Sequence, residues 1–535
     1  MHGARLLMAA TLLNYLLALL GARPAASTPA AEYAGAKRTR SNQHWNPRVR
    51  SANQEIRGDN ATLHARALSL ARDEPLCDNC RQTIVDEVVG TGILSHADAR
   101  GPNGESLTEF DLAVDDFLEN WEGECDLTDE RDWTGMCGEN LSDTIVQGNS
   151  FLVESYDPDP FRVSPVRYEL IEPHQLDRTR DNWSGWMSKA GGGNLIMNGI
   201  EYDRLGRPVT YYIVRNRQEQ LGWGFSQGDP IPAARVIHHF RRERSGQKWG
   251  VTWFRKIIAK VFSKDQYIDH EIDAAQNAAK LIAFFQSDVA DSMGLKLDDS
   301  GSIVDKNGNP FEGLAPSTFM TGTTTEKLTV MGNPRPSSTG DVFIRALDRL
   351  MGLGMHMSYY RVAGDSAGLT YSNLRAENAK DDTYFDPVRE WQIRRVDRPA
   401  RTRVLTEALA MGRIKGPGVP SPSEFLAEPR RFLRAEYIAG TTQFIDRQKE
   451  VAGSIAAVQG CLSTFQFELA QQRRYWRQVF RQQAEEREYA KQLGLPVELI
   501  FNPGTKQAIT TDDVDVIGQP AKTVAEELAK ELADA

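Results

Sequence analysis

The segment of residues 251–293 constrains the fold of this chain most, because it contains neither glycine nor proline. Its apolar residues recur at the three- and four-residue steps of an α-helix; they are Phe254, Ile257, Ile258, Val261, Ile268, Ile272, Ala275, Ala279 and Ile282. At a rise of 1.5 Å per residue, a helix over the whole segment would span up to about 60 Å. The pattern therefore predicts a long strut that ends near Gly294.

Two further features flank this strut on its C-terminal side. Turn signals at 299–301 and 306–308 predict a hairpin between Lys296 and Phe311. A Pro/Ser-rich break at 334–338 is followed by a shorter helical pattern from Val342 to Leu353.

In the rest of the chain, helical sequence patterns alternate with strand-like ones, which predicts an α+β fold. Helical patterns cover 61–88, 106–121, 373–412 and 443–494, and a polar extended arm is expected over 28–60. Turns at Asn198-Gly199 and Leu205-Gly206 separate short β-like runs; these are Ser150–Glu154, Tyr168–Ile171, Val209–Val214 and Arg235–Phe240.

Length, composition and charge limit the classes of protein to which this chain can belong. The 535 residues carry 63 Lys+Arg and 73 Asp+Glu, a formal charge of −10, and suggest two to four domains. The hydrophobic share of 40% and charged share of 25% exclude wholesale disorder and a polytopic membrane protein. The acidic balance argues against wrapping nucleic acid by bulk charge. A local net of +5 between Lys37 and Arg66 nevertheless keeps a DNA-binding scaffold open.

The N-terminus admits two interpretations. Arg5 precedes an apolar run from Leu6 to Leu20, followed by small residues, so residues 1–27 resemble a signal peptide. The same run would also suit a hydrophobic helix that docks on the body or on a neighbouring subunit. At the other end, the last 25 residues carry a net charge of −5 and predict a mobile acidic tail.

The five cysteines do not support a disulfide framework or a zinc site. Cys77 and Cys80 form a C-x-x-C motif, but no second pair or H-x-x-x-H follows it. Cys125 and Cys137 have the wrong spacing for a zinc ribbon, and Cys461 stands alone. We expect four small, partly buried thiols and no metal.

The segment Gly364-Asp365-Ser366-Ala367-Gly368 matches the G-x-S-x-G nucleophile elbow of a secreted serine esterase. That elbow requires a strand before the serine and a histidine after it in the chain. None of the nine histidines lies beyond Ser366, and the Ala190–Gly193 loop lacks the histidine of an HGGG oxyanion motif. The esterase remains the alternative function, disfavoured on these grounds.

Other chemical motifs also fail. The Asp305-x-Asn307-x-Asn309 run has proline where a calcium loop needs its glycine, and the chain contains no P-loop. The arginine clusters have no interleaved aromatic platform in sequence; they are Arg394, Arg395, Arg398, Arg401 and Arg403, and Arg430, Arg431 and Arg434. The sequence predicts no catalytic residue and no cofactor.

A series of short segments in fixed order resembles the portal proteins of lambda-type tailed phages, over roughly residues 31–495. The segments are Val88–Ile93, Trp121, Gln147–Phe151, Leu170–Pro173, Asn198–Tyr202, Gly206–Pro208, Ile231–Ala233, Val236–His238, Gly364–Ala376, Phe444–Asp446, Gln471–Gln472 and Gly494–Pro496. The Gly364–Ala376 block resembles the loop-to-helix segment of that family, which accounts for the false esterase elbow.

The resemblance implies a non-enzymatic structural subunit of a ring, typically of twelve copies, at one vertex of a viral capsid. Double-stranded DNA would be packaged and ejected through the axial channel, and the fold would comprise wing, stem, clip and crown. Implied partners are further copies of the chain, a terminase ATPase, major capsid and scaffold proteins, and head–tail adaptors. The implied location is the virion, with the host cytoplasm during assembly.

The same resemblance implies a division of the chain. It assigns 28–250 to the arm and wing, 251–286 to the first stem helix, 287–337 to the clip, and 338–355 to the second stem helix. Residues 356–372 would form a tunnel loop facing DNA, 373–495 the wing and crown helices, and 496–535 the acidic tail. The DNA-channel residues expected in the tunnel loop are His356, Tyr359, Tyr360, Arg361, Asp365 and Ser366.

Overall fold

The computed structural model describes residues 40–182, 194–215, 228–280, 340–439 and 447–495, together with four short strands between 283 and 322. Several predicted features lie outside these residues: the 1–27 segment, the 190–193 loop, the Asp305–Asn309 run, most of the 287–337 clip and the 496–535 tail. The chain divides into two units, Met1–Glu55 and Ile56–Ala535, and the features below belong to the second unless a range crosses that boundary.

The N-terminal helices differ in part from the prediction. Helix α2 (Ala52–Asp73) begins inside the stretch 28–60 that was expected to be extended, because residues 52–57 include good helix formers and Glu55 occupies the first turn. Helix α3 (Pro75–Val88) follows after Glu74, and its N-terminal proline splits the predicted helix of 61–88 in two. Helix α4 (Thr108–Glu122) confirms the second pattern, predicted over 106–121, whereas α5 (Trp133–Gln147) was not predicted.

Two small sheets carry the β structure of the N-terminal half. One has the order β3-β2-β8, with antiparallel strands Val166–Ile171, Ser150–Tyr156 and Val236–His239. The other has the order β4-β5-β6-β7, with strands Leu195–Met197, Ile200–Tyr202, Pro208–Ile213 and Asp229–Pro232. All four predicted strands are present, and Asn198 and Gly199 have the positive φ values, 53° and 71°, of a tight hairpin turn.

A third pairing joins distant parts of the sequence. Strand β1 (Leu94–Ala97) is antiparallel to β13 (Ala435–Ile438), with Leu94 opposite Ile438. Most of the buried apolar residues form one cluster around α3, α4, α5, α9 and α10, and a smaller cluster lies beneath the β4–β7 sheet.

The strut is shorter than its sequence pattern predicts. A 3₁₀ turn, η7 (Trp253–Lys256), comes first, capped by the side chain of Thr252, and α6 then covers Ile258–Lys280. These 23 residues correspond to about 35 Å rather than 60 Å. The helix does not continue because β9 (Ala283–Gln286) is extended and pairs in parallel with β12 (Phe319–Gly322).

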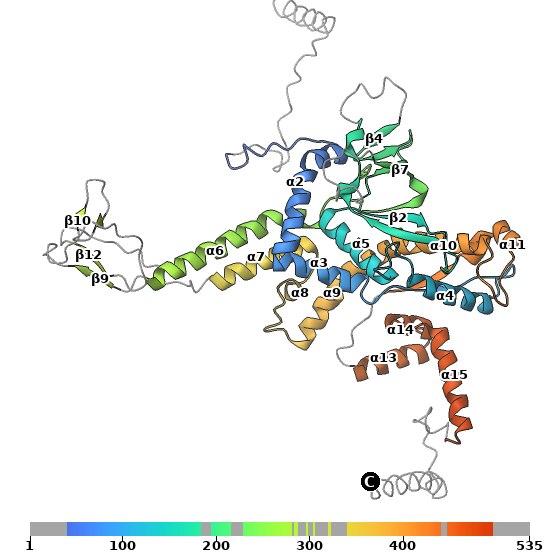
Figure 1. The fold of residues 1–535 in the computed structure, drawn as a ribbon. Coiled ribbons are helices and arrows are strands. Elements are labelled where there is room, and N and C mark those ends of the chain that lie inside the picture. Colours follow the sequence, from blue (N-terminus) through green and yellow to red (C-terminus); the bar gives the residue numbers. More distant parts are fainter. Residues whose placement is uncertain are drawn as a thin grey trace, which may run out of the picture. The chain divides into compact units, whose positions relative to one another are not determined.

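The second strut helix and the hairpin agree with prediction. Helix α7 (Gly340–Met355) runs beside α6 in Figure 1 and contacts it. Strands β10 (Lys296–Leu297) and β11 (Ile303–Val304) are antiparallel, which confirms the hairpin around its first turn.

The C-terminal half is helical but interrupted. Helix α8 (Tyr359–Ala363) precedes α9 (Tyr371–Gln392), the π-helical turn η9 (Ile393–Asp397) and α10 (Arg398–Ala410). Two short helices, α11 (Pro422–Ala427) and α12 (Pro429–Phe432), follow. The pattern predicted over 443–494 is three helices, α13 (Arg447–Gln459), α14 (Phe465–Gln471) and α15 (Trp476–Gln492), broken where Cys461 and Arg473 adopt positive φ.

Within the described residues, no helix combines the length and apolar character that a bilayer crossing requires.

Candidate functional site

The segment that joins α7 to α9 contains the residues predicted to face DNA. It was expected to be a loop over 356–372, but its first part is folded, because α8 occupies Tyr359–Ala363. His356 takes a positive φ of 61° at the end of α7, and the Met357 amide donates to the Gly352 carbonyl at 2.9 Å. Residues 356–358 and 364–370 are irregular, and the longer stretch lies between the left-handed Gly364 and the α9 N-cap Thr370.

A buried carboxylate from α9 holds the start of α8. Asp381 is 1% exposed and accepts the Ser358 amide at 3.0 Å and the Ser358 hydroxyl. Its Oδ2 also lies 3.2 Å from Nε of Arg361. Burial raises the pKa of Asp381, while the bonds from Ser358 and the charge of Arg361 oppose that rise.

Arg361 is committed to contacts within the chain rather than to solvent. Besides Asp381, its guanidinium pairs with Glu87 of α3, and Asn79 of α3 donates to the carbonyls of Arg361 and Val362 at 2.7 and 3.0 Å. Burial alone would lower its pKa, but the pairing with Glu87 raises it. These bonds attach α8 to α3 as well as to α9.

The two tyrosines of α8 are also engaged. The Tyr359 hydroxyl donates to Asp365 at 3.2 Å, and the Tyr360 hydroxyl donates to Asn378 of α9. Asp365 also accepts the Ala367 amide at 2.9 Å, which makes an Asx turn and, with the bond from Tyr359, lowers the pKa of the Asp365 carboxyl.

His356 precedes α8 in the chain and packs against α9 and the turn η7. Its ring stacks on Tyr384 with centroids 5.1 Å apart, and its Nε2 lies 3.4 Å from Nζ of Lys256. Burial and the positive charge of Lys256 lower the pKa of His356.

Ser366 is exposed, and the structure gives it no catalytic setting. The helix α8, not a strand, precedes it, and the loop 364–370 separates it from α9. Because a nucleophile elbow needs a strand-to-helix turn, the geometry does not support the esterase.

The helices of the strut expose apolar side chains. Tyr267 and Phe343 meet edge to face between α6 and α7, with ring centroids 5.2 Å apart. Other apolar residues of these helices point to solvent, with exposed fractions between 47 and 67%; they are Phe262, Ile272, Val342, Leu350 and Leu353.

The four cysteines of the N-terminal half are buried and free, and Cys461 is exposed. His238 and His239 are buried as well, and burial lowers the pKa of His239 to about 3. In the described part of the chain, no three side chains of the ligating types converge as a metal site would need.

Sequence reasoning missed the groups that hold the connection between α7 and α9, residues 356–370. Glu87, Asn79 and Asp381 lie on α3 and α9, up to about three hundred positions from their partners. It also missed a basic hollow between the end of β8 and α9, in which Trp391 and Arg395 are one helical turn apart. The i, i+4 spacing of Trp391 and Arg395 was the one feature of the sequence that could have indicated that their side chains lie side by side.

The structure thus combines a mixed α+β region, a strut of two helices, and a short connection, residues 356–370, that is attached to α3 and α9. The profile of the lambda family of phage portal proteins matches residues 38–389, and this chain belongs to that family.

Curated relatives carry the same description. The chain is 21% identical to portal protein B of Escherichia phage lambda over 513 residues, 88% of this chain and 92% of that protein. It is 24% identical to the probable portal protein of Halomonas phage phiHAP-1 over 373 residues, covering 67% and 68%. It is also similar to a portal protein of Escherichia phage N15, at 21% identity over 84% of this chain and 88% of the relative.

Solved structures give a weaker likeness. A chain in the neck of a native gene transfer agent particle has a TM-score of 0.35 at 12% identity, covering 73% of this chain and 88% of that one. A chain of the corresponding virion has a TM-score of 0.33 at 13% identity, over 80% and 94%.

Proposed function

We propose that this protein is the structural subunit of a phage portal, a homo-oligomeric ring at one vertex of the capsid through which DNA is packaged and ejected. The ring has about twelve copies, performs no catalysis of its own, and serves as the docking site for terminase, capsid and head–tail connector proteins. Membership of the portal family supports this role.

The exposed apolar side of the strut is the observation that carries the proposal. Val342 and Leu353 of α7 are 67 and 65% exposed, and Phe262 of α6 is 59% exposed. An isolated strut would leave this surface in water, whereas cyclic packing of identical struts would bury it. A ring of twelve such chains would carry about −120 charges, which repel phosphate at a distance and suit a conduit.

The proposal divides the chain as the family resemblance implies. The arm and wing comprise 28–250, the stem comprises 251–286 and 338–355, and the clip of 287–337 meets terminase and adaptors. The segment 356–372 faces DNA, and residues 373–495 form wing and crown helices ahead of the 496–535 tail. Since Arg361 and Tyr360 are engaged with α3 and α9, Ser366 and its neighbours form the DNA-facing tip.

Negative-stain electron microscopy with mass photometry tests assembly. We expect rings of about a dozen subunits with a central hole, and loss of rings in the V342D/L353D variant, because charge on the strut surface opposes burial. Leu205→Asp is the matched control, since Leu205 is 78% exposed on the turn between β5 and β6. A wild-type protein that stays monomeric at high concentration, or rings that survive in V342D/L353D, would contradict the proposal.

A further inference from the structure

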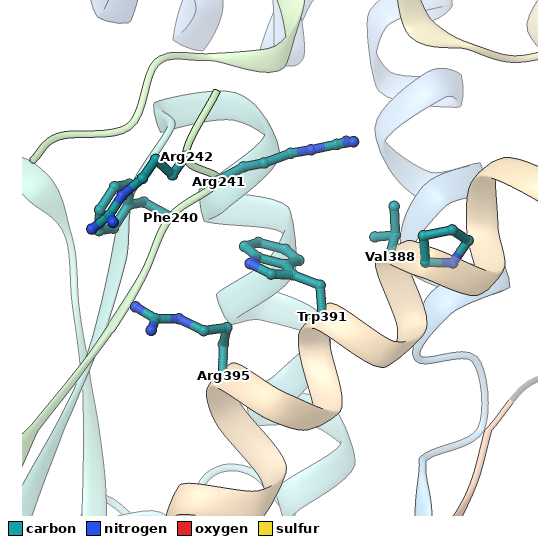
Figure 2. Close-up of a pocket in the computed structure, with 7 residues that line it drawn as sticks. Phe240, Arg241, Arg242, Val388, Trp391 and Arg395 are labelled. Atoms are coloured by element: carbon teal, nitrogen blue, oxygen red, sulfur yellow. The ribbon is translucent and has the colours of Figure 1, made fainter. Parts of the chain in front are cut away.

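A basic hollow of about 390 Å³ lies between the segment after β8 and the C-terminal turns of α9. Figure 2 shows the indole of Trp391 between the side chains of Arg241 and Arg395, with Arg242 beside Phe240. The arginines come from two segments 150 residues apart in sequence, and Arg395 sits in the π-helical turn η9. Such turns inside α-helices are frequent at functional sites.

The three guanidiniums of this hollow have neutral partners. Arg241 donates to the Tyr384 hydroxyl at 3.0 Å, and Arg395 donates to the His238 carbonyl at 3.3 Å. The Arg242 guanidinium lies over the ring of Phe240, 6.0 Å from its centroid. Among the described residues, no carboxylate is recorded within 4 Å of any of the three, whereas the adjacent Arg394 pairs with Glu390 at 3.0 Å.

This concentration of positive charge is uncompensated. Burial lowers the pKa of Arg395, and the nearby charge of Arg242 lowers it further. Like charges held together cost free energy that an anion would recover.

The basic surface continues past Arg241 into a second hollow of about 50 Å³. Arg241 lines both, and Lys256 lines the second. Glu243 is the carboxylate in this second lining, and it pairs with Arg255. The track of cations that have no carboxylate partner among the described residues is thus Arg395, Arg242, Arg241 and Lys256, an arrangement suited to a ligand with repeated negative charges.

The floor of the track is aromatic. Trp391 stacks on His239 with centroids 4.0 Å apart, and Arg241 lies over the rings of Trp253 and Tyr384 at 5.2 and 5.4 Å. The sequence showed no aromatic residues interleaved within the arginine clusters. In the fold, Trp391 lies one helical turn before Arg395, and Trp253 comes from another segment. Flat apolar rings beside guanidiniums provide a surface for sugar and base as well as for phosphate.

We propose that this arginine–tryptophan track binds the phosphate backbone of DNA, with phosphates bound by Arg242 and Arg395 at one end and by Arg241 and Lys256 at the other. The inference rests on the proposed function, in which DNA passes the ring. An acidic peptide would satisfy the cations but would leave the aromatic floor without a role, so the nucleic acid is the better match. Because the whole chain is acidic, the contact is local and depends strongly on salt.

Anisotropy of a fluorescein-labelled 20-base-pair duplex, titrated with full-length protein between 50 and 200 mM NaCl, tests the site. The variant is R242A/R395A, which spares Arg241 and its bond to Tyr384. We expect the affinity at 50 mM NaCl to fall about tenfold or more, and the slope of log K against log salt to become shallower by about two, one per lost phosphate contact. The matched control Arg394→Ala, one residue away and 64% exposed in its pair with Glu390, should bind within about twofold of wild type.

Equal binding and slope in R242A/R395A and wild type would overturn the proposal, as would an equal loss in Arg394→Ala. Capture of a labelled peptide of residues 511–535 through Arg242 and Arg395, with no effect of these arginines on duplex binding, would assign the site to an acidic segment and also overturn it. Electron microscopy of the same samples distinguishes failure of this inference from failure of the proposed function. Rings that bind DNA independently of the track refute only this inference, whereas absence of rings refutes the proposed function.

Discussion

The ammonium of Lys264 and the carboxylate of Asp348 lie 2.6 Å apart and join the two strut helices, α6 and α7. Their side chains are only 11 and 8% exposed, so the pair is largely removed from water. A buried ion pair fixes the register of two helices because each charge is costly without the other. The strut is therefore held by a specific polar contact as well as by apolar packing.

Removing one partner of this pair should destabilise the strut strongly. We expect Lys264→Met to lower the free energy of unfolding by about 3 kcal/mol, because it leaves Asp348 buried without its cation. The double variant K264M/D348L should recover most of that loss, since neither charge remains. Urea unfolding followed by circular dichroism, at one fixed protein concentration, measures both values.

The surface pair Arg345–Asp341 provides the control for this comparison. It lies on α7 at 3.1 Å, with side chains 45 and 69% exposed. Arg345→Ala should cost less than about 0.5 kcal/mol. A loss of that small size in Lys264→Met, or no recovery in the double variant, would show that the buried pair does not set the register.

Gly148 should tolerate no side chain. Its φ is +82°, and a Cβ would lie 2.6 Å from the Val251 carbonyl carbon, where the chain before the strut crosses the end of α5. Asn149 secures this crossing, because its Oδ1 accepts the Gly250 amide at 2.7 Å. Gly148→Ala should therefore lower the free energy of unfolding by about 3 kcal/mol, the sum of a left-handed alanine and a backbone clash.

Gly368→Ala separates these two contributions. Gly368 has a similar φ of +79°, but a Cβ there would meet no atom within 4 Å. The loss should be about 1 kcal/mol, from backbone conformation alone. Equal decreases in melting temperature in the two variants would mean that the backbone around Val251 moves to accommodate the methyl group added at position 148 without further loss of stability.

Asp397 should make stability fall as pH rises toward neutrality. The residue is 5% exposed, and burial raises its pKa to about 7, although the Trp133 indole donates to it at 3.1 Å. In the unfolded chain the pKa is about 3.9. Between these values the folded state holds a proton that the unfolded state has lost, so the free energy of unfolding decreases with rising pH, by at most about 1.4 kcal/mol per unit.

Asp397→Asn tests this assignment, because the amide is similar in shape and stays neutral. Urea midpoints at pH 5 and pH 7 should show the variant gaining about 2 kcal/mol on wild type between the two conditions. Asp116→Asn, at an exposed position of α4, should leave the pH dependence unchanged. Parallel profiles for Asp397→Asn and wild type would show that another buried acid carries the effect.

The parts of the fold that sequence predicted are those set by local pattern. Helices α4 and α7 follow from apolar spacing, and the β4–β5 turn follows from Asn198-Gly199, because periodicity and turn chemistry act over a few residues. Helix α5 escaped notice because its two glycines and short polar residues weaken the helical signal.

Long-range contacts account for the remaining differences. The β1–β13 pairing joins residues more than three hundred positions apart, and the strut length depends on where β9 turns away to pair with β12. In the connection between α7 and α9, only the fold shows that Asp381 and Glu87 hold Arg361 inside the chain. Tertiary partners of this kind leave no trace in local sequence.

Shortening the connection between α7 and α9 should separate assembly from DNA handling. Deletion of residues 365–369 removes only the irregular tip, because α8 ends at Gly364 and Thr370 caps α9. The attachments of α8 to Asp381 and Asn79 lie outside the deletion, so rings and thermal stability should match wild type. We expect phage carrying the deletion to package or retain less DNA, measured as genome length per particle.

A second variant, with the same five positions replaced by glycine and serine, keeps the chain length. It therefore distinguishes a requirement for the length of the loop from a requirement for its side chains. Full-length genomes in the deletion would show that the tip does not act on DNA.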